Sequence, residues 1–117
     1  FVKHSDDVTK TVELSRKSKT RGEAAEHAAD AMSKGKPAVR TVGRPGAPAN
    51  RKESLKGHKK VPGKQLDEYP PAMFREGGAG ASVRPVNPSH NMSAGACIGN
   101  ACRGLKNGDK IRIKVVD

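Results

Sequence analysis

Aromatic residues are almost missing from this sequence. There is no tryptophan, and Phe1, Tyr69 and Phe74 are the only aromatic residues among 117. Proteins that bind single-stranded nucleic acids usually stack bases on several exposed rings. This chain has too few rings for such a platform. A nucleic acid would therefore be held through its phosphates, with weak sequence preference and strong salt dependence.

Long apolar runs and acidic residues are also scarce. Hydrophobic residues make up 33% of the chain, so the core must be thin. Neither a run of roughly 20 apolar residues nor an amphipathic helix with large apolar side chains is present, and we expect no membrane insertion. The 23 Lys and Arg against 12 Asp and Glu give a net charge of +11. This charge favours a polyanionic partner, nucleic acid above all.

The chain has two cysteines, Cys97 and Cys102. On one helix their side chains would point about 140° apart, which disfavours a disulfide. Their spacing, without further cysteines, is also a poor zinc signature. We expect two small buried residues. The start at Phe1, with no signal-peptide pattern after it, indicates a domain cut from a longer or processed protein.

The length predicts a single domain. Residues 1–19 are polar and basic, and we expect an N-terminal segment or linker there, although Val8, Val12 and Leu14 alternate weakly as in a strand. The folded domain is expected over 20–117. Alternating apolar and polar residues predict strands at 38–42, 82–86 and 110–116.

Two helices are predicted from their end signals. The first starts at Thr20, which has capping-box spacing to Glu23, and stops at Gly35. The second has Asn87 as its N-cap, Pro88 at its first position and its end at Gly104. Its interior glycines, 95 and 99, each cost about 1 kcal/mol against alanine, which suggests that another backbone approaches closely.

Positive charge is concentrated between residues 31 and 66, where ten Lys and Arg accompany one acid, Glu53. The segment is either a solvated loop with a short helix near 50–55 or a surface that binds phosphates. We favour the phosphate-binding surface because it adjoins an acidic cluster. The DNA-binding candidates are Arg40, Arg44, Arg51, Lys52, Lys56, Lys59, Lys60, Arg75 and Arg84.

That acidic cluster lies in LDEYPPAMFREGGAGAS, residues 66–82, and contains Asp67, Glu68 and Glu76. The order of strand, glycine-rich hairpin, strand and helix, with Asn91 in the first helical turn, is the layout of a ββα-metal finger over about 67–104. Phosphodiester hydrolysis needs a base, a hard cation and basic residues that hold the polyanion. Oxygen ligands suit Mg²⁺, Mn²⁺ or another hard divalent metal.

These residues resemble the NucA/NucB-type deoxyribonucleases of bacteria. The resemblance covers residues from about 21 to 116 and implies a small α+β domain with a ββα-metal-type nuclease core. It implies a metal-dependent, largely sequence-nonspecific DNA endonuclease. It is carried by DEYP at 67–70, Ala72, EGG at 76–78, GAS at 80–82, Asn91 and AG at 94–95, and more weakly by RKESL, RPGA, Glu23, His27, Asp30 and Ala31.

The resemblance also suggests roles for the site residues. Asp67 is the expected general base, and Asn91 with a glutamate, Glu76 or Glu68, would coordinate Mg²⁺ or Mn²⁺ directly or through water. The division of roles among the three carboxylates stays open. Glu68 could instead orient an arginine, and Glu76 could make a structural contact at the hairpin.

His90 is a second candidate for the base because histidine titrates near neutral pH. It precedes Asn91, where family members often carry an acid, and helix neighbours point about 100° apart. The two side chains therefore need not face one phosphate, and His90 could contact DNA instead. We expect packing roles for His27 and Tyr69.

Secreted family members carry a cysteine pair at the positions of Arg40 and Phe74. A fold independent of oxidation suits a reducing cytoplasm. With the strong basicity, this implies a toxin domain that is secreted or delivered by a secretion system and acts in the cytoplasm of a target cell. The implied partners are DNA and an acidic immunity protein.

Three alternatives remain. A secreted housekeeping nuclease of the same family would share the site. A non-catalytic basic nucleic-acid-binding module would leave the acids unexplained, because without a metal they would repel phosphate. A ribonuclease toxin would use histidine or lysine catalysts and no metal.

Overall fold

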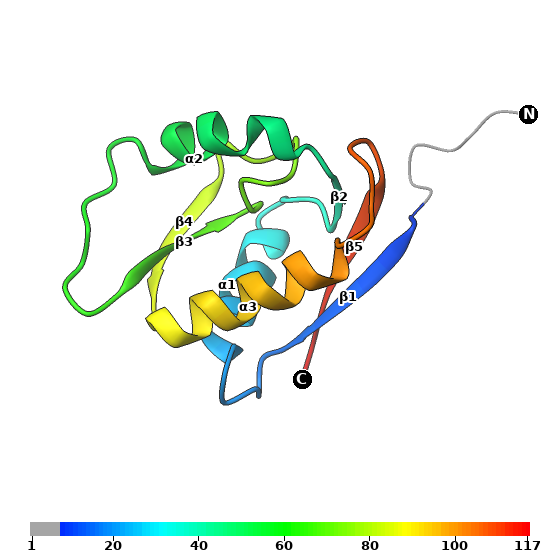
Figure 1. Cartoon of the computed structure of the whole chain (residues 1–117). Coiled ribbons are helices and arrows are strands. Elements are labelled where there is room, and N and C mark those ends of the chain that lie inside the picture. The colour runs from blue at the N-terminus through cyan, green and yellow to red at the C-terminus, as the bar shows by residue number, and fades with distance from the viewer. Residues whose placement is uncertain (1–7) are drawn as a thin grey trace, which may run out of the picture.

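A three-stranded sheet forms one side of the molecule in the computed structural model, which describes residues 8–117 (Figure 1). β5 (Lys110–Val116) is its central strand. β1 (Lys10–Ser15) pairs with β5 in parallel, and β2 (Val39–Thr41) pairs with it in antiparallel fashion. Phe1 lies outside the described residues. The sheet thus joins the two ends of the described part of the chain.

A separate two-stranded hairpin carries the acidic stretch. β3 (Gln65–Tyr69) and β4 (Ser82–Val86) are antiparallel, and their register sets Asp67 opposite Arg84. Successive side chains on a strand point to opposite faces. Asp67 and Glu68 therefore face opposite sides of the hairpin.

Three helices surround this hairpin. α1 (Gly22–Ser33) contacts β1 and β5 as well as β3 and β4, so it lies between the two sheets. α3 (Pro88–Ala101) packs on α1, β1 and β3, while α2 (Ala47–Leu55), which follows a single 3₁₀ turn at Arg44–Gly46, packs on the hairpin. The observed order β3, β4, α3 is the predicted ββα arrangement within a small α+β domain.

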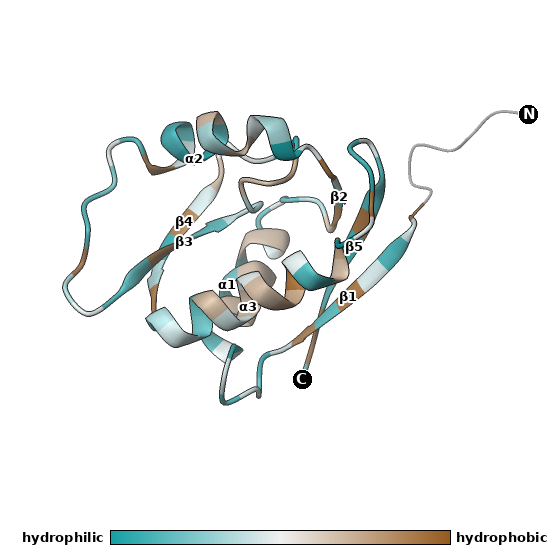
Figure 2. Ribbon diagram, viewed as in Figure 1, coloured by the Kyte–Doolittle hydropathy of each residue, from teal (hydrophilic) through white to brown (hydrophobic). Residues whose placement is uncertain are grey.

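The apolar core lies mainly beside the larger sheet. Leu14, Ile111 and Ile113 are at most 2% exposed, and they pack with Phe74 and with the small alanine side chains of α1. In Figure 2 brown residues recur along β1 and β5, whereas β3 is mostly teal. Burial of large side chains thus stabilises the larger sheet, while the hairpin is more polar.

Several local predictions are confirmed. The strands expected at 82–86 and 110–116 are β4 and β5, and β2 lies within 38–42. Asn87 caps α3 by accepting hydrogen bonds from the backbone N–H groups of Ser89 and His90, although the helix ends at Ala101, before Gly104.

The alternation at Val12 and Leu14 forms β1, within the stretch expected to be a segment or linker. Its pairing with β5 makes it part of the same fold. The folded unit therefore starts before residue 20. Over residues 8–117, no helix combines the length and the hydrophobicity that crossing a bilayer would require.

The predicted capping box at Thr20 is wrong. Arg21 is the N-cap of α1, and the Glu23 carboxylate accepts the backbone N–H of Asn87 at 2.8 Å. In return, His90 Nδ1 accepts the backbone N–H of Glu23 at 3.1 Å. The first turns of α1 and α3 therefore cap one another, a pairing between distant segments that local spacing could not indicate.

The close backbone approach expected at the two helix glycines is also wrong. A Cβ built on Gly95 or Gly99 would meet no heavy atom of the described residues within 4 Å. These positions face open space.

Candidate active site

A cleft of about 840 Å³ opens along β3. All five residues of β3 line it, because β4 pairs with one edge of this strand and no other strand of the described chain pairs with the second edge. α3 contributes one helical face, and the 56–64 loop after α2 contributes the other wall. The cleft therefore gathers the polar residues of the hairpin beside basic residues of the loop.

Asp67 is held in this cleft by a buried histidine. Its Oδ2 lies 2.7 Å from His27 Nδ1, and His27 Nε2 lies 2.9 Å from Ser82 Oγ. An ionised carboxylate only accepts hydrogen bonds, so Nδ1 must donate to it. His27 is 0% exposed and Asp67 has 19% of its side chain exposed. The histidine thus orients the carboxylate without reaching the open cleft itself.

A second ionic pair lies beside this one. Arg84, opposite Asp67 in the hairpin register, donates from Nη2 to Asp30 Oδ2 at 2.7 Å. The hydrogen bond from Arg84 holds the pKa of the Asp30 carboxyl below its ordinary value. His27 and Asp30 are three residues apart on α1, so one helix face receives both hairpin side chains.

Glu68 faces the opposite side of the hairpin. Its Oε2 accepts a hydrogen bond from Ser54 on α2, and its Oε1 lies 3.8 Å from Arg51 Nε. Glu68 has 11% of its side chain exposed and Arg51 has 62%. Glu68 thus forms an ion pair with an arginine that remains open to solvent, and whether its main role is this contact or metal binding stays a prediction.

Asn91 lies in the same cleft, on the face of α3 that is turned toward β3. Its Nδ2 donates to Gln65 Oε1 at 2.9 Å. This bond fixes the amide so that Oδ1, the oxygen a hard cation would bind, points away from Gln65. Gln65 was not among the expected site residues, and nothing in its local sequence distinguishes it from a solvated glutamine.

Two of the expected catalytic residues lie elsewhere. Glu76 does not line the cleft, and both its carboxylate oxygens bind Thr41, with Oε1 2.8 Å from the backbone nitrogen and Oε2 2.7 Å from Oγ1. Glu76 thus ties the 70–81 loop to β2, the structural contact that was the alternative. His90 also lies outside the cleft lining, where it caps α1.

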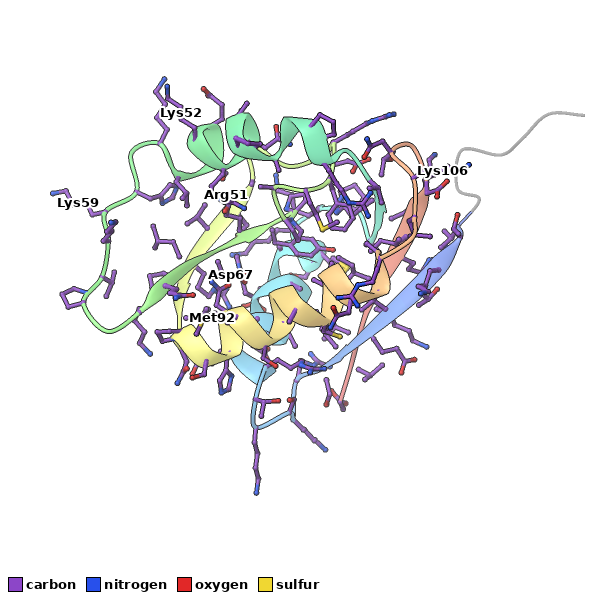
Figure 3. The ribbon with its side chains drawn as sticks, in the orientation of Figure 1. Arg51, Lys52, Lys59, Asp67, Met92 and Lys106 are labelled. Atoms are coloured by element: carbon purple, nitrogen blue, oxygen red, sulfur yellow. The ribbon has the colours of Figure 1, made fainter. Side chains whose placement is uncertain are left out.

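The structure separates the expected DNA-binding residues into three groups. Arg51 and Lys60 line the cleft, and Lys64, which was not among the candidates, lines it as well. Lys52, Lys56 and Lys59 are exposed on α2 and the following loop. In Figure 3 Lys52 and Lys59 extend from this side of the molecule into solvent.

The remaining DNA-binding candidates contact other parts of the protein or lie away from the cleft. Arg40 is 0% exposed with its guanidinium 4.8 Å from the centroid of the Tyr69 ring, so its assignment to DNA binding is wrong. Arg44 donates to the carbonyl oxygens of Cys102 and Leu105, in the segment that follows α3. Arg75 is exposed but lines a separate hollow, and Arg84 pairs with Asp30.

Tyr69 and the cysteines behave as packing residues. Tyr69 is 3% exposed, and burial raises the pKa of its hydroxyl, an effect that the positive charge of Arg40 partly offsets. Burial likewise raises the pKa of the Cys102 thiol, which keeps it protonated. Cys97 is half-buried, and both thiols are free.

The oxygen donors in the cleft suit a cation that keeps most of its water. Within residues 8–117 no three Asp, Glu, His or Cys side chains are grouped as a ready-made metal cage. Asn91, Asp67 and Glu68 nevertheless bring an amide and two carboxylates to one cleft. Mg²⁺ typically binds through one or two protein oxygens with water and substrate phosphate in the other positions. The donor set fits such an ion and does not fit zinc.

Comparisons with known proteins agree on one family. The model of the deoxyribonuclease NucA/NucB family matches residues 9–114. The DNA-entry nuclease of Bacillus subtilis (strain 168) is 39% identical over 89 residues, or 76% of this chain. The match covers 60% of that relative, so this chain spans less than two thirds of its length.

Proposed function

The chain belongs to the NucA/NucB deoxyribonuclease family, and we propose that it is a divalent-metal-dependent, largely sequence-nonspecific endonuclease that hydrolyses DNA. The observation that carries the proposal is the cleft, where Asp67, Glu68 and Asn91 share a lining with three basic side chains. Acids alone would repel a phosphate. Acids with a cation and a basic rim can hold one and activate water against it.

Asp67 is the proposed general base. His27 donates to Oδ2, so the carboxylate is held in one orientation and Oδ1 is the atom proposed to take the proton from the attacking water. Because His27 is fully buried and cannot meet the substrate, it is a positioning residue. A well-placed base typically contributes 10²–10⁴-fold to the rate.

The other cleft residues hold the substrate and the ion. Arg51, Lys60 and Lys64 are proposed to bind the phosphates, which carry no sequence information. Asn91 through Oδ1 is a proposed ligand of Mg²⁺ or Mn²⁺, and Glu68, whose carboxylate also meets Ser54 and Arg51, is proposed to reach the ion through water. Such an ion would neutralise the charge that develops on the phosphate.

The test is the conversion of supercoiled plasmid to nicked and linear forms. We expect cleavage with Mg²⁺ or Mn²⁺ and none in excess EDTA. Undiminished cleavage in the chelator would contradict the metal mechanism. An RNA of matched length is the control substrate, since cleavage of RNA alone would indicate the ribonuclease alternative.

We further propose that the domain is an antibacterial toxin whose inhibitor is an acidic immunity protein. The net charge of +11 and the absence of cysteine at residues 40 and 74 support this context. An acidic partner that covers the 34–64 segment and the cleft would block DNA, and its on-rate should fall steeply with salt.

Expression in a bacterial host tests this context. We expect the wild-type domain to harm the host cytoplasm and the Asp67→Asn variant to accumulate without harm. If active wild-type domain accumulates harmlessly, a secreted housekeeping nuclease is the better account.

A further inference from the structure

The cleft is larger than a phosphate and a metal ion require, and part of its lining is apolar. Beyond the polar residues of β3, its lining includes Leu55, Val61, Leu66 and Ile98. Val61 is 40% exposed, one of two large hydrophobic residues of the described chain that remain open to solvent. An apolar surface beside a phosphate-binding rim is a chemistry that suits a nucleotide, whose base is flat and largely apolar on its faces.

One helical face builds a wall of this apolar part. Asn91, Ala94, Gly95 and Ile98 follow the spacing of a single face of α3, and all four line the cleft. Asn91 is the polar end of this face, bonded to Gln65 of β3, and Ile98 is the buried apolar end. The face therefore runs from the proposed reaction centre into the apolar part.

Gly95 stands in the middle of that wall. Glycine destabilises a helix interior relative to alanine, and of the two interior glycines of α3 only Gly95 lines the cleft. A Cβ at this position would meet none of the described residues within 4 Å, which excludes packing within that part of the chain as the reason for a glycine here. The missing side chain instead leaves room inside the cleft, as glycine does where a ligand approaches a backbone.

We propose that this part of the cleft receives one unstacked nucleobase of the DNA strand that is cut, so that the enzyme prefers single-stranded or locally opened DNA. The inference rests on the proposed function. Lys60 and Lys64 flank Val61 and Pro62 on the opposite wall, so phosphates on either side of the base would meet positive charge. Aliphatic walls accept the face of any base, which agrees with cleavage without sequence preference.

To place a base in this subsite, duplex DNA must unstack and unpair it at a cost in free energy, whereas the bases of a single strand are already accessible. The affinity for a single strand should therefore differ from the affinity for the duplex of the same sequence. The subsite is tested by fluorescence anisotropy in EDTA with the Asp67→Asn background, so that nothing is cut. Gly95→Leu fills the subsite, and Gly99→Leu is its matched control, because Gly99 is also helical, is also free of neighbours within 4 Å among the described residues, and does not line the cleft.

We expect the single strand to bind more tightly than the duplex, and Gly95→Leu to weaken its binding about tenfold, which corresponds to about 1.4 kcal/mol. Gly99→Leu should bind as the background does. A series of single-stranded oligonucleotides, each with one abasic nucleotide at a different position, tests the base itself. We expect a similar loss of affinity when the abasic nucleotide stands at one particular position. That loss should vanish in Gly95→Leu, because the base and the cavity form one interaction.

Equal binding by the two leucine variants, or an abasic series without a sensitive position, would overturn the proposal. If Gly95→Leu does not fold, Gly95→Ala and Gly95→Val replace it, and the loss should grow with side-chain size. A chain that shows this coupling but cuts no plasmid with Mg²⁺ or Mn²⁺ would refute the proposed function and keep the base subsite. A chain that cuts plasmid but shows no such coupling would refute the base subsite and keep the proposed function.

Discussion

On β5, Ile111 and Ile113 are fully buried, whereas four of the five residues of β3 are only half-buried. The larger sheet is stabilised mainly by apolar packing, and the hairpin side chains are held by hydrogen bonds and ion pairs to α1 and α2. Apolar packing leaves nothing available for chemistry. Polar contacts orient side chains while part of each carboxylate stays open to the cleft, so the proposed site lies on the less apolar sheet.

The largest effect should come from the hairpin. Asp67→Asn removes the proposed base and is expected to lower the plasmid-nicking rate by 10²–10⁴-fold, because the amide cannot accept the proton. The circular dichroism spectrum should stay that of the wild type. Glu13→Gln, an exposed substitution on β1, is the control. A folded Asp67→Asn variant that cuts at the wild-type rate would show that another residue is the general base.

A core substitution in the larger sheet should lower the stability of the protein and leave its nicking rate unchanged. Ile113→Ala leaves a cavity at a fully buried position and is expected to lower the free energy of unfolding by about 2–5 kcal/mol. Urea denaturation measures this loss. At a temperature where the variant is folded, its nicking rate should match the wild type, and a large loss of rate would show that the two sheets are more strongly coupled than their contacts indicate.

His27 tests the link between the regions. His27→Leu keeps apolar volume but removes the donor to Asp67, and we expect its nicking kcat to fall about tenfold, in line with the loss of one charge-assisted hydrogen bond. His27→Asn restores a donor near the Nδ1 position and should recover part of kcat, although it packs less well. If the leucine variant keeps more activity than the asparagine variant, the histidine has only a packing role.

Glu76 should behave as a structural acid although it belongs to the same acidic stretch as Asp67. Glu76→Gln keeps the shape but weakens two bonds to Thr41, with an expected loss of about 1–3 kcal/mol in the free energy of unfolding. Its nicking rate with saturating Mg²⁺ should stay near that of the wild type. If the nicking rate of Glu76→Gln recovers only at a much higher Mg²⁺ concentration, Glu76 takes part in metal binding.

The smallest effect concerns pH. The pKa of Asp30 is lowered in the folded state, so the unfolded chain binds this proton more readily. Its stabilisation is therefore complete above the ordinary value of 3.8 and is lost as the pH falls below it. Wild type should exceed Asp30→Asn in thermal stability by a small constant margin at pH 5–7, and the margin should close in more acidic buffer. A margin independent of pH would exclude the ion pair as its cause.

Sequence reasoning worked where the signals are local. The alternation at 82–86 and 110–116, the Asn87 cap and the clustering of Asp67 and Glu68 depend on neighbours within a few residues, and the structure reproduces these elements. It failed where the partner is distant. The bond between His27 and Asp67 spans 40 residues, and that between Thr41 and Glu76 spans 35.

By itself the sequence determined the α+β class, the family and the residue types that the proposed chemistry needs, because these follow from composition, short-range periodicity and a compact motif. Only the tertiary structure decided which acids share a cleft, since Asp67 and Glu68 line it and Glu76 binds β2. It also decided which basic residues can meet a phosphate: Arg40 is buried against Tyr69, while Lys64 lines the cleft. Charge is a property of the residue, but exposure and hydrogen-bond partners depend on which segments pack together.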